Sequence, residues 1–580
     1  MPAKRTRSAS TPKGKPSPAK GPAERLPDAE TTRIVAQAGL TLGEGSQEPL
    51  MSALSELRAA PSLRDLKTPQ DVRESTPALK EEVKRFHGAK ASLAWFPLWL
   101  TDSTCGDHFG YLSTSPIRKK SKLSFTNAHV DLMNQLGAIM GDAGREPPPL
   151  PPPVENSLTP AGFTYFGQFV DHDITLDISS SLDSPTDANT VPNMRSPSLD
   201  LDSVYGRGPV LEPYLYDFPA GGPPTAIKLK LGSNSPIGPG GPAGPSATPA
   251  GMVQKSDFDV PRIPGTQTAV IGDPRNDENL IVTQFHHAML RFHNKVVDML
   301  VAVPFAGDIF VEAKKIVRHH YQWAVVHDFL ERICGPAAVS AALSGVTAPI
   351  GSSFRMPVEF SVAAYRFGHS MIRDQYWVNF NFPNATLGQV FAFARMPNLP
   401  VFSNWVVDFN AFFDTGVPVP VHNKIRPIDS VLANGLESLP GFSGMMAELA
   451  SRNLRRGLAL GLPSGQGMAE QFGIASLTGA QIKAGLPANE VALLDMAGKT
   501  LLKKTPLWYY VLREAAVLEG GKRLGPVGAR IVAETFIRIL KRDGDSYLNA
   551  PGTFIPFLPS DTPSTFKVAD LIKFAGVHLP

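Results

Sequence analysis

The sequence predicts a mainly α-helical fold in one large domain, because apolar residues recur at helical spacing in several long stretches and strand patterns are short and scattered. The clearest helical pattern covers residues 279–303, where apolar side chains return every three or four positions. Residues 309–334, 527–540 and 568–574 show the same spacing. The best strand signal is the short aromatic run at residues 376–382.

Length and composition indicate a protein with a large core and long irregular segments. The chain has 580 residues, of which 42% are hydrophobic, together with 50 glycines and 55 prolines. The formal net charge of +3 does not favour nucleic acid as a main partner. Two cysteines, Cys105 and Cys334, exclude a disulfide framework.

The basic residues gather at the beginning of the chain. Residues 1–26 carry seven Lys/Arg and one acidic residue, in a stretch rich in Pro, Ser and Ala. We expect residues 1–88 to be a disordered basic tail and linker, and residues 89–580 to form the folded domain. A proline run at 147–153 predicts a polyproline II spacer, and residues 219–252 predict a long surface loop rich in Gly and Pro.

No apolar run is long enough for a transmembrane helix, and no apolar stretch follows the basic start as a Sec signal would require. A secreted protein that lacks a Sec signal and a cytoplasmic protein both remain open. A monomer is the default expectation.

The first candidate site lies in residues 166–173, Phe-Gly-Gln-Phe-Val-Asp-His-Asp. In a helix, Gln168, Asp171 and His172 would share one face, while Asp173 would point elsewhere. A surface helix with a few charges is the plain alternative. The surrounding aromatic residues favour burial instead, and a buried Gln, Asp and His together need partners.

The second candidate site is the segment 272–279, which leads directly into the long apolar helix. Asp277 and Glu278 suit a helix N-terminus, where carboxylates satisfy unpaired N–H groups. Arg275 does not fit this explanation, because a cation is disfavoured at that end of a helix. We therefore expect an anionic or electron-rich partner next to Arg275.

Two further segments place polar residues in apolar surroundings. His369 closes the sequence Arg-Phe-Gly-His and, taken alone, is more typical of a packed core histidine. Asn453 and Arg456 lie in residues 450–457, which alone would be a basic helix end followed by a turn.

Together, these four segments resemble the animal-type haem peroxidases of the peroxidase–cyclooxygenase superfamily, and more closely its bacterial members. The resemblance covers residues 163–548. It implies one large helical haem domain with little β structure and long loops. The implied activity is that of a haem-dependent peroxidase, which reduces hydrogen peroxide and, by way of an oxidised haem, oxidises a halide, thiocyanate or a phenol.

The resemblance implies roles for the residues on the peroxide side of the haem. His172 corresponds to the distal histidine, Gln168 to the distal glutamine of the small-substrate site, and Arg275 to the distal arginine. Asp171 and Glu278 match two carboxylates that can form esters with methyl groups of haem b. These roles agree with elementary chemistry, because neutral imidazole is a suitable base and a guanidinium stabilises negative charge without titrating.

On the opposite side of the haem, His369 matches the iron ligand. Asn453 matches the asparagine that accepts a hydrogen bond from that ligand, and Arg456 falls where the family places an arginine on a haem propionate. Histidine is a standard axial ligand, and its second ring nitrogen needs a fixed partner.

A calcium site is also implied. Ser196, Ser198, Asp200 and Asp202 place oxygen-bearing side chains at every second position of an extended segment, a pattern that suits Ca²⁺. The family has a calcium loop at this place, and Asp173 is available to join it because it points away from the haem side. A polar surface loop is the alternative explanation.

Three positions separate this chain from other members of the superfamily. Asn279 stands where some mammalian members carry a methionine, so no sulfonium link to haem is expected. Fatty-acid dioxygenases carry a radical-forming tyrosine three residues before the iron ligand, and that position is Arg366 here. Tyr365 lies one step off and is expected to face elsewhere. A fatty-acid dioxygenase and a non-catalytic haem- or calcium-binding protein remain the alternatives.

Hydrogen peroxide and a small-molecule reductant are the expected partners of this chain. The remaining histidines include His286, which follows Arg275 along the chain. No acidic or cysteine partner completes a zinc set with it, so we expect a packed polar residue.

Overall fold

The computed structural model describes residues 108–141, 158–235, 256–347, 354–392, 399–439 and 447–578. Helices dominate these residues, which confirms the predicted mainly α-helical fold. The expected tail at residues 1–88, the proline run at 147–153 and Cys105 lie outside the described residues, as do residues 236–252 of the expected surface loop.

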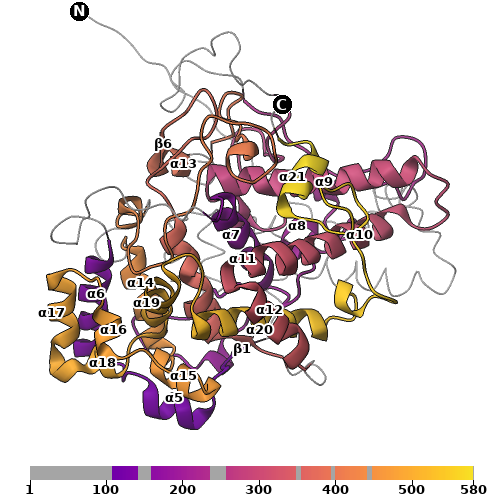
Figure 1. The fold of residues 1–580 in the computed structure, drawn as a ribbon. Coiled ribbons are helices and arrows are strands. Elements are labelled where there is room, and N and C mark those ends of the chain that lie inside the picture. Colours follow the sequence, from indigo (N-terminus) through magenta and orange to yellow (C-terminus); the bar gives the residue numbers. More distant parts are fainter. Residues whose placement is uncertain are drawn as a thin grey trace, which may run out of the picture.

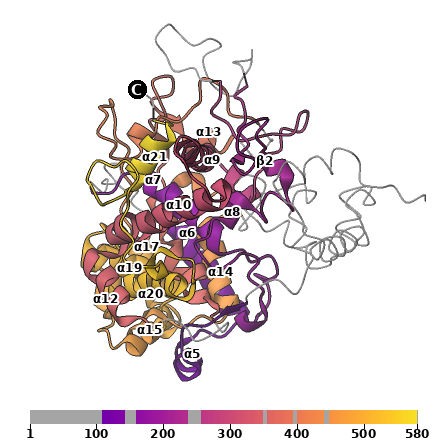
Figure 2. The same cartoon turned by 90° about the vertical axis from the view of Figure 1, so that its right-hand side faces the viewer.

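The longest helix is α9 (Leu280–Val301), which corresponds to the predicted helix at 279–303. Its first turn is capped by Asn279, whose side-chain oxygen accepts hydrogen bonds from the backbone N–H groups of Ile281 and Val282. Helices α7 (Gly162–Ile174), α10 (Ile309–Ala324) and α21 (Val568–Ala575) pack against it. In Figures 1 and 2, α9 and α21 lie in the upper half of the fold.

The predicted helix at 309–334 is divided into three parts. Helix α10 continues into the π-helix η7 (Val325–Leu330), and the short helix α11 (Glu331–Cys334) follows. The wider π turns change which side chains share a face, which the 3.6-residue period of the sequence does not show. Cys334 is buried and forms no disulfide.

A second group of helices forms the lower half of the fold in both views. Helix α14 (Leu449–Ala459) packs against α6 (Asn127–Met140) and α19 (Leu507–Glu519), and α20 (Pro526–Arg542) packs against α12 (Pro336–Gly345). Buried side chains from both groups form one continuous apolar core, which surrounds α7. The other helices that the structure describes are α5 (Ser115–Ser121), η4 (Ala188–Thr190), α8 (Asp202–Tyr205), η5 (Pro213–Leu215), η6 (Pro274–Asp277), η8 (Glu359–Ala363), η9 (Ala364–Met371), α13 (Leu387–Ala392), η10 (Phe409–Ala411), η11 (Asn434–Leu436), α15 (Gly465–Phe472), α16 (Gly479–Lys483), α17 (Ala488–Asp495), η13 (Ala497–Lys499), α18 (Thr500–Lys503) and η14 (Tyr547–Asn549).

Within the described ranges, the strands form three short pairs. Strand β1 (Phe109–Gly110) pairs in parallel with β4 (Met356–Pro357), whereas β2 (Tyr216–Asp217) with β3 (Lys228–Leu229), and β5 (Gln375–Tyr376) with β6 (Ala385–Thr386), are antiparallel. The strand predicted at 376–382 is therefore limited to its beginning. Among the described residues, no helix is both long enough and apolar enough to span a bilayer.

Candidate active site

The first wall of the site is helix α7, which lies in the centre of the core. Its start requires a glycine, because a Cβ on Gly162 would lie 2.5 Å from the carbonyl oxygen of Phe412. Gln168, Asp171 and His172 all line one cavity, as their spacing predicts. Asp173, on the other side of the helix, is fully buried and faces a different set of residues.

The surroundings of His172 fix both its tautomer and its charge. Its Nδ1 lies 2.9 Å from the side-chain oxygen of Asn276, which accepts only, so Nδ1 carries the proton. Burial lowers the pKa of His172 to about 3, and Arg275 acts in the same direction. The imidazole is therefore neutral at physiological pH, and its Nε2 can accept a proton.

Arg275 has the anionic partner that the sequence required, and that partner is Asp273. The guanidinium Nε and Nη2 donate to the two carboxylate oxygens of Asp273 at 3.1 and 2.8 Å, and Nη2 also donates to the carbonyl of His172 at 2.9 Å. Burial alone would raise the pKa of Asp273, but Arg195 and Arg275 together hold it well below its usual range. Asp273 is therefore a buried anion between two cations.

Arg195 was not anticipated from the sequence. It donates to Asp202 at 3.1 Å and pairs with Asp273 at 2.5 Å, with 2% of its side chain exposed. No local pattern could have revealed this, because Arg195 precedes Asp273 by many residues. Asp273 itself could have been recognised, since its side chain also accepts from the backbone N–H of Arg275 two residues later, as aspartates at helix starts do.

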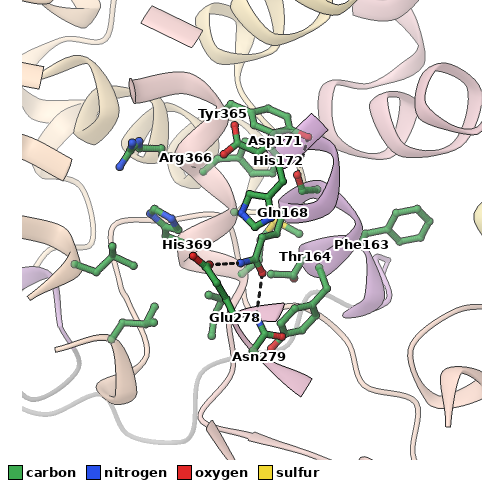
Figure 3. A pocket seen from close by; sticks show the side chains of 18 of the residues that line it. Phe163, Thr164, Gln168, Asp171, His172, Glu278, Asn279, Tyr365, Arg366 and His369 are labelled. Carbon is green, nitrogen blue, oxygen red and sulfur yellow. Dashed lines mark hydrogen bonds between the residues drawn. The ribbon is translucent and has the colours of Figure 1, made fainter. Parts of the chain in front are cut away.

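Gln168 is fixed from both ends of its amide. Its Nε2 donates to Glu278 at 3.0 Å, and its Oε1 accepts from Asn279 at 3.1 Å, as the dashed lines in Figure 3 show. Glu278 and Asn279 therefore lie on the same cavity as α7, although they come from a segment more than a hundred residues away.

The opposite wall carries His369 in η9, and Figure 3 shows it on the same cavity as His172 and Gln168. Burial lowers the pKa of His369 to about 3, with contributions from Arg366 and Arg452, so this imidazole is also neutral. Asn453 lies next to it, as predicted. However, the amide nitrogen of Asn453 faces Nδ1 of His369 at 2.7 Å, because its oxygen accepts from Arg366 at 2.6 Å.

Tyr365 does not face away from the cavity as expected. It lines the cavity, and its hydroxyl donates to the carbonyl of Gly167 in α7 at 3.2 Å. The expectation assumed regular α-helical turns. The segment instead passes from the π-helix η8 into the 3₁₀ helix η9, which changes the direction of every side chain.

A second, more polar cavity adjoins the first. Five residues line both of them, namely Asp171, His172, Ser361, Arg366 and Leu449. Four arginines line the second cavity, namely Arg275, Arg366, Arg452 and Arg456. Arg456 is paired with Asp177 at 3.0 Å and with Ser180.

The donor set of the two cavities fits a haem. A neutral histidine is available as axial ligand, and the glycine before it, Gly368, borders open space, since a Cβ there would meet nothing within 4 Å. The arginines of the second cavity suit carboxylate groups such as propionates. Asp171 and Glu278 also line the first cavity, and burial raises the pKa of Asp171.

On the far side of α7, three carboxylates form a cluster. One oxygen from each of Asp173, Asp200 and Asp202 lies within 4.8 Å of the others. Burial raises the pKa of all three, and that of Asp202 reaches about 7 despite Arg195. A hard cation bound among the three carboxylates would relieve the repulsion between their negative charges. The backbone N–H of Ser196 donates to Asp202, and the roles of Ser196 and Ser198 as Ca²⁺ ligands remain predictions.

Comparison with known proteins identifies relatives of this chain. Residues 179–556, which are well over half of the chain, match the family model described as animal haem peroxidase. The matched range contains Arg275, His369 and Asn453, but it begins after His172. The position of His172 opposite His369 therefore comes from the structure rather than from this match.

Among curated proteins, thyroid peroxidase of Homo sapiens is 27% identical over 379 residues, which are 60% of this chain and 37% of that protein. Chorion peroxidase of Drosophila melanogaster is 27% identical over 308 residues, 49% of this chain and 36% of that protein. The chain thus spans little more than a third of the length of either relative. Peroxidase A of Dictyostelium discoideum shares the fold, with a TM-score of 0.54 and 16% identity over 82% of this chain and 94% of that one.

Proposed function

Since this chain belongs to the animal haem peroxidase family, we propose that it is a haem-dependent peroxidase, which reduces hydrogen peroxide and oxidises a small reductant. One observation carries the proposal: two neutral histidines, His172 and His369, line a single cavity that continues into an arginine-lined one. We further propose, from the resemblance of its motifs, that the chain is nearer to the bacterial members of the family.

In this proposal His369 holds the haem iron, and Arg456 in the second cavity holds a haem propionate. Haem, when bound, supplies the redox chemistry that cleaves the O–O bond and withdraws electrons from the reductant. Halide, thiocyanate and phenols remain open as reductants. Gln168, fixed between Glu278 and Asn279, would set the space available to a small substrate.

The chain's own residues move the proton. Nε2 of His172 accepts a proton from hydrogen peroxide and returns it to the departing oxygen as water forms. Arg275 stabilises the negative charge that develops, and its ion pair with Asp273 keeps the guanidinium from swinging away. The backbone carbonyl of His172 accepts from the same guanidinium, so base and cation hold each other in place.

We also propose that Ca²⁺ binds at Asp173, Asp200 and Asp202, with oxygens from Ser196 and Ser198. Asp173 directly follows His172 in α7. A cation bound there would fix the end of α7 and with it the position of the base.

The test is an absorption spectrum of the haem-loaded full chain before and after one equivalent of hydrogen peroxide. A Soret band that shifts with peroxide and returns with bromide, thiocyanate or a phenol supports the proposal. His369→Ala should lose most of the haem. His172→Ala should keep the haem and react with peroxide about 10²- to 10⁴-fold more slowly. Failure of the wild-type chain to bind haem would refute the proposal.

A fatty-acid dioxygenase is the second candidate, and the position of Tyr365 on the cavity wall favours it. Against it, Arg366 occupies the position three residues before His369 and is bound to Asn453. Oxygen uptake with an unsaturated fatty acid, without peroxide-dependent oxidation of halide or phenol, would establish the dioxygenase instead.

A further inference from the structure

The side chain of Asn276 lies between two buried histidines. Its Oδ1 is 2.9 Å from Nδ1 of His172, and its Nδ2 is 3.1 Å from Nδ1 of His286 in helix α9. Asn276 and His286 are both fully buried. The three side chains form a line that starts at the cavity and ends in the core.

The chemistry of an amide makes this line directional. The oxygen can only accept and the nitrogen can only donate, so His172 must carry its proton on Nδ1 while His286 must leave Nδ1 bare. Burial lowers the pKa of His286 to about 3, so it is neutral and carries its single proton on Nε2. That Nε2 has no hydrogen-bond partner within the described part of the chain.

We infer that Asn276, oriented by His286, is a positioning residue that sets the tautomer of His172 and so leaves its Nε2 bare toward the cavity. This inference rests on the proposed role of His172 as the base. If the amide were reversed, its N–H would face Nδ1 of His172, and the proton would move to Nε2, where the base must be empty. His286 opposes that reversal, because its bare Nδ1 accepts from the amide nitrogen.

Two measurements on the ferric, haem-loaded full chain test the inference: the rate of reaction with hydrogen peroxide and the association rate of cyanide. Hydrogen cyanide must pass its proton to a base as it binds, so cyanide reports on His172 without turnover. Asn276→Leu, which removes the acceptor, should slow both rates by at least about tenfold. Asn276→Asp, which keeps an acceptor, should stay within about threefold of the wild type.

Two controls separate positioning from general damage. Asn294→Leu removes another amide that is bound through both its ends, here to the backbone of Leu229, and should leave both rates unchanged. Haem content and melting temperature should be alike in all variants compared. If Asn276→Leu does not fold, the variants His286→Leu and His286→Gln are compared instead. Only Gln retains an acceptor for the amide nitrogen of Asn276. The glutamine variant should then be the faster of the two.

The outcomes distinguish the inference from the proposed function. If cyanide rates follow the predicted order but no variant reacts with peroxide, the inference stands and the peroxidase proposal fails. If the wild type reacts rapidly with peroxide and a folded, haem-loaded Asn276→Leu matches it in both rates, the inference is overturned and the peroxidase proposal stands.

Discussion

The guanidinium of Arg366 donates to Oδ1 of Asn453 at 2.6 Å, so the amide oxygen that was expected to face His369 is already occupied. An iron-bound imidazole keeps its proton on Nδ1 and needs an acceptor there. If His369 binds the haem iron as proposed, we expect the amide of Asn453 to turn on haem binding and to release Arg366. Arg366 lines both cavities and is positioned to move toward a haem carboxylate.

Replacing Asn453 tests this relationship. Asn453→Asp offers an oxygen to both Arg366 and His369, so haem affinity should be retained and the reduction potential should fall. Asn453→Leu removes the acceptor and should weaken haem binding by about 10- to 100-fold. Haem titration followed by absorption measures the haem affinity of both variants, with Asn294→Leu as the control. Equal affinity of the Leu and Asp variants would contradict the assigned role.

Arg195 should be among the most sensitive positions for stability. Arg195→Leu leaves the fully buried Asp273 and the partly exposed Asp202 without their shared cation, which should cost about 3–5 kcal/mol of unfolding free energy. Arg455→Leu is the matched control, because its partner Asp183 is 59% exposed and such pairs contribute about 0–1 kcal/mol. Urea denaturation measures the unfolding free energy of both variants. Similar losses in the two variants would argue against a special role for Arg195.

The stabilising effect of Ca²⁺ should depend on pH. Without metal, burial raises the pKa of Asp202 to about 7, above the ordinary value of about 4. Between about pH 4 and pH 7, the folded state therefore keeps a proton on Asp202 that the unfolded state has lost. Stability from this group is therefore present at low pH and is lost as pH rises to 7. Ca²⁺ binds the ionised carboxylate and should therefore recover the stability that is lost as pH rises.

The measurement is the melting temperature with Ca²⁺ and with a chelator at pH 5 and pH 8. The shift caused by Ca²⁺ should be clearly larger at pH 8, and Asp202→Asn should reduce it at that pH. A shift of the same size at both pH values would mean that Asp202 is not a ligand.

Covalent attachment of haem can be tested at Asp171 and Glu278, which both line the first cavity. Ester formation on a haem methyl is a two-electron oxidation, for which hydrogen peroxide is the oxidant. After turnover, haem should remain with the unfolded wild-type chain in mass spectrometry, and it should separate from the double variant Asp171→Asn, Glu278→Gln. Complete release from the wild type after peroxide treatment would rule out the ester links.

Helical periodicity predicted those parts of the site that lie on regular helices. Gln168, Asp171 and His172 share a cavity because α7 is an ordinary α-helix, whereas the place of Asn453 beside His369 was implied by the family resemblance and not by periodicity. The predicted need of Arg275 for an anionic partner was likewise met, by Asp273.

Other parts could not be predicted, for two physical reasons. Tyr365 reaches the cavity because π and 3₁₀ turns replace α turns before His369, and turn type is not visible in the spacing of apolar residues. The direction of the Asn453 amide depends on Arg366, and the burial of Arg195 depends on its ion pair with Asp273, far along the chain. These arrangements are set by tertiary contacts, which cannot be inferred from residue periodicity.

Two central contacts of the site join residues that are far apart in the sequence. The hydrogen bond between His172 and Asn276 joins residues 104 positions apart, and the contact between His369 and Asn453 joins residues 84 positions apart. Contacts of this kind form late in folding, because closing such loops costs entropy before any contact compensates for it. During synthesis, the contact between His369 and Asn453 therefore cannot form until Asn453 has left the ribosome, so the cavities cannot be complete before that point.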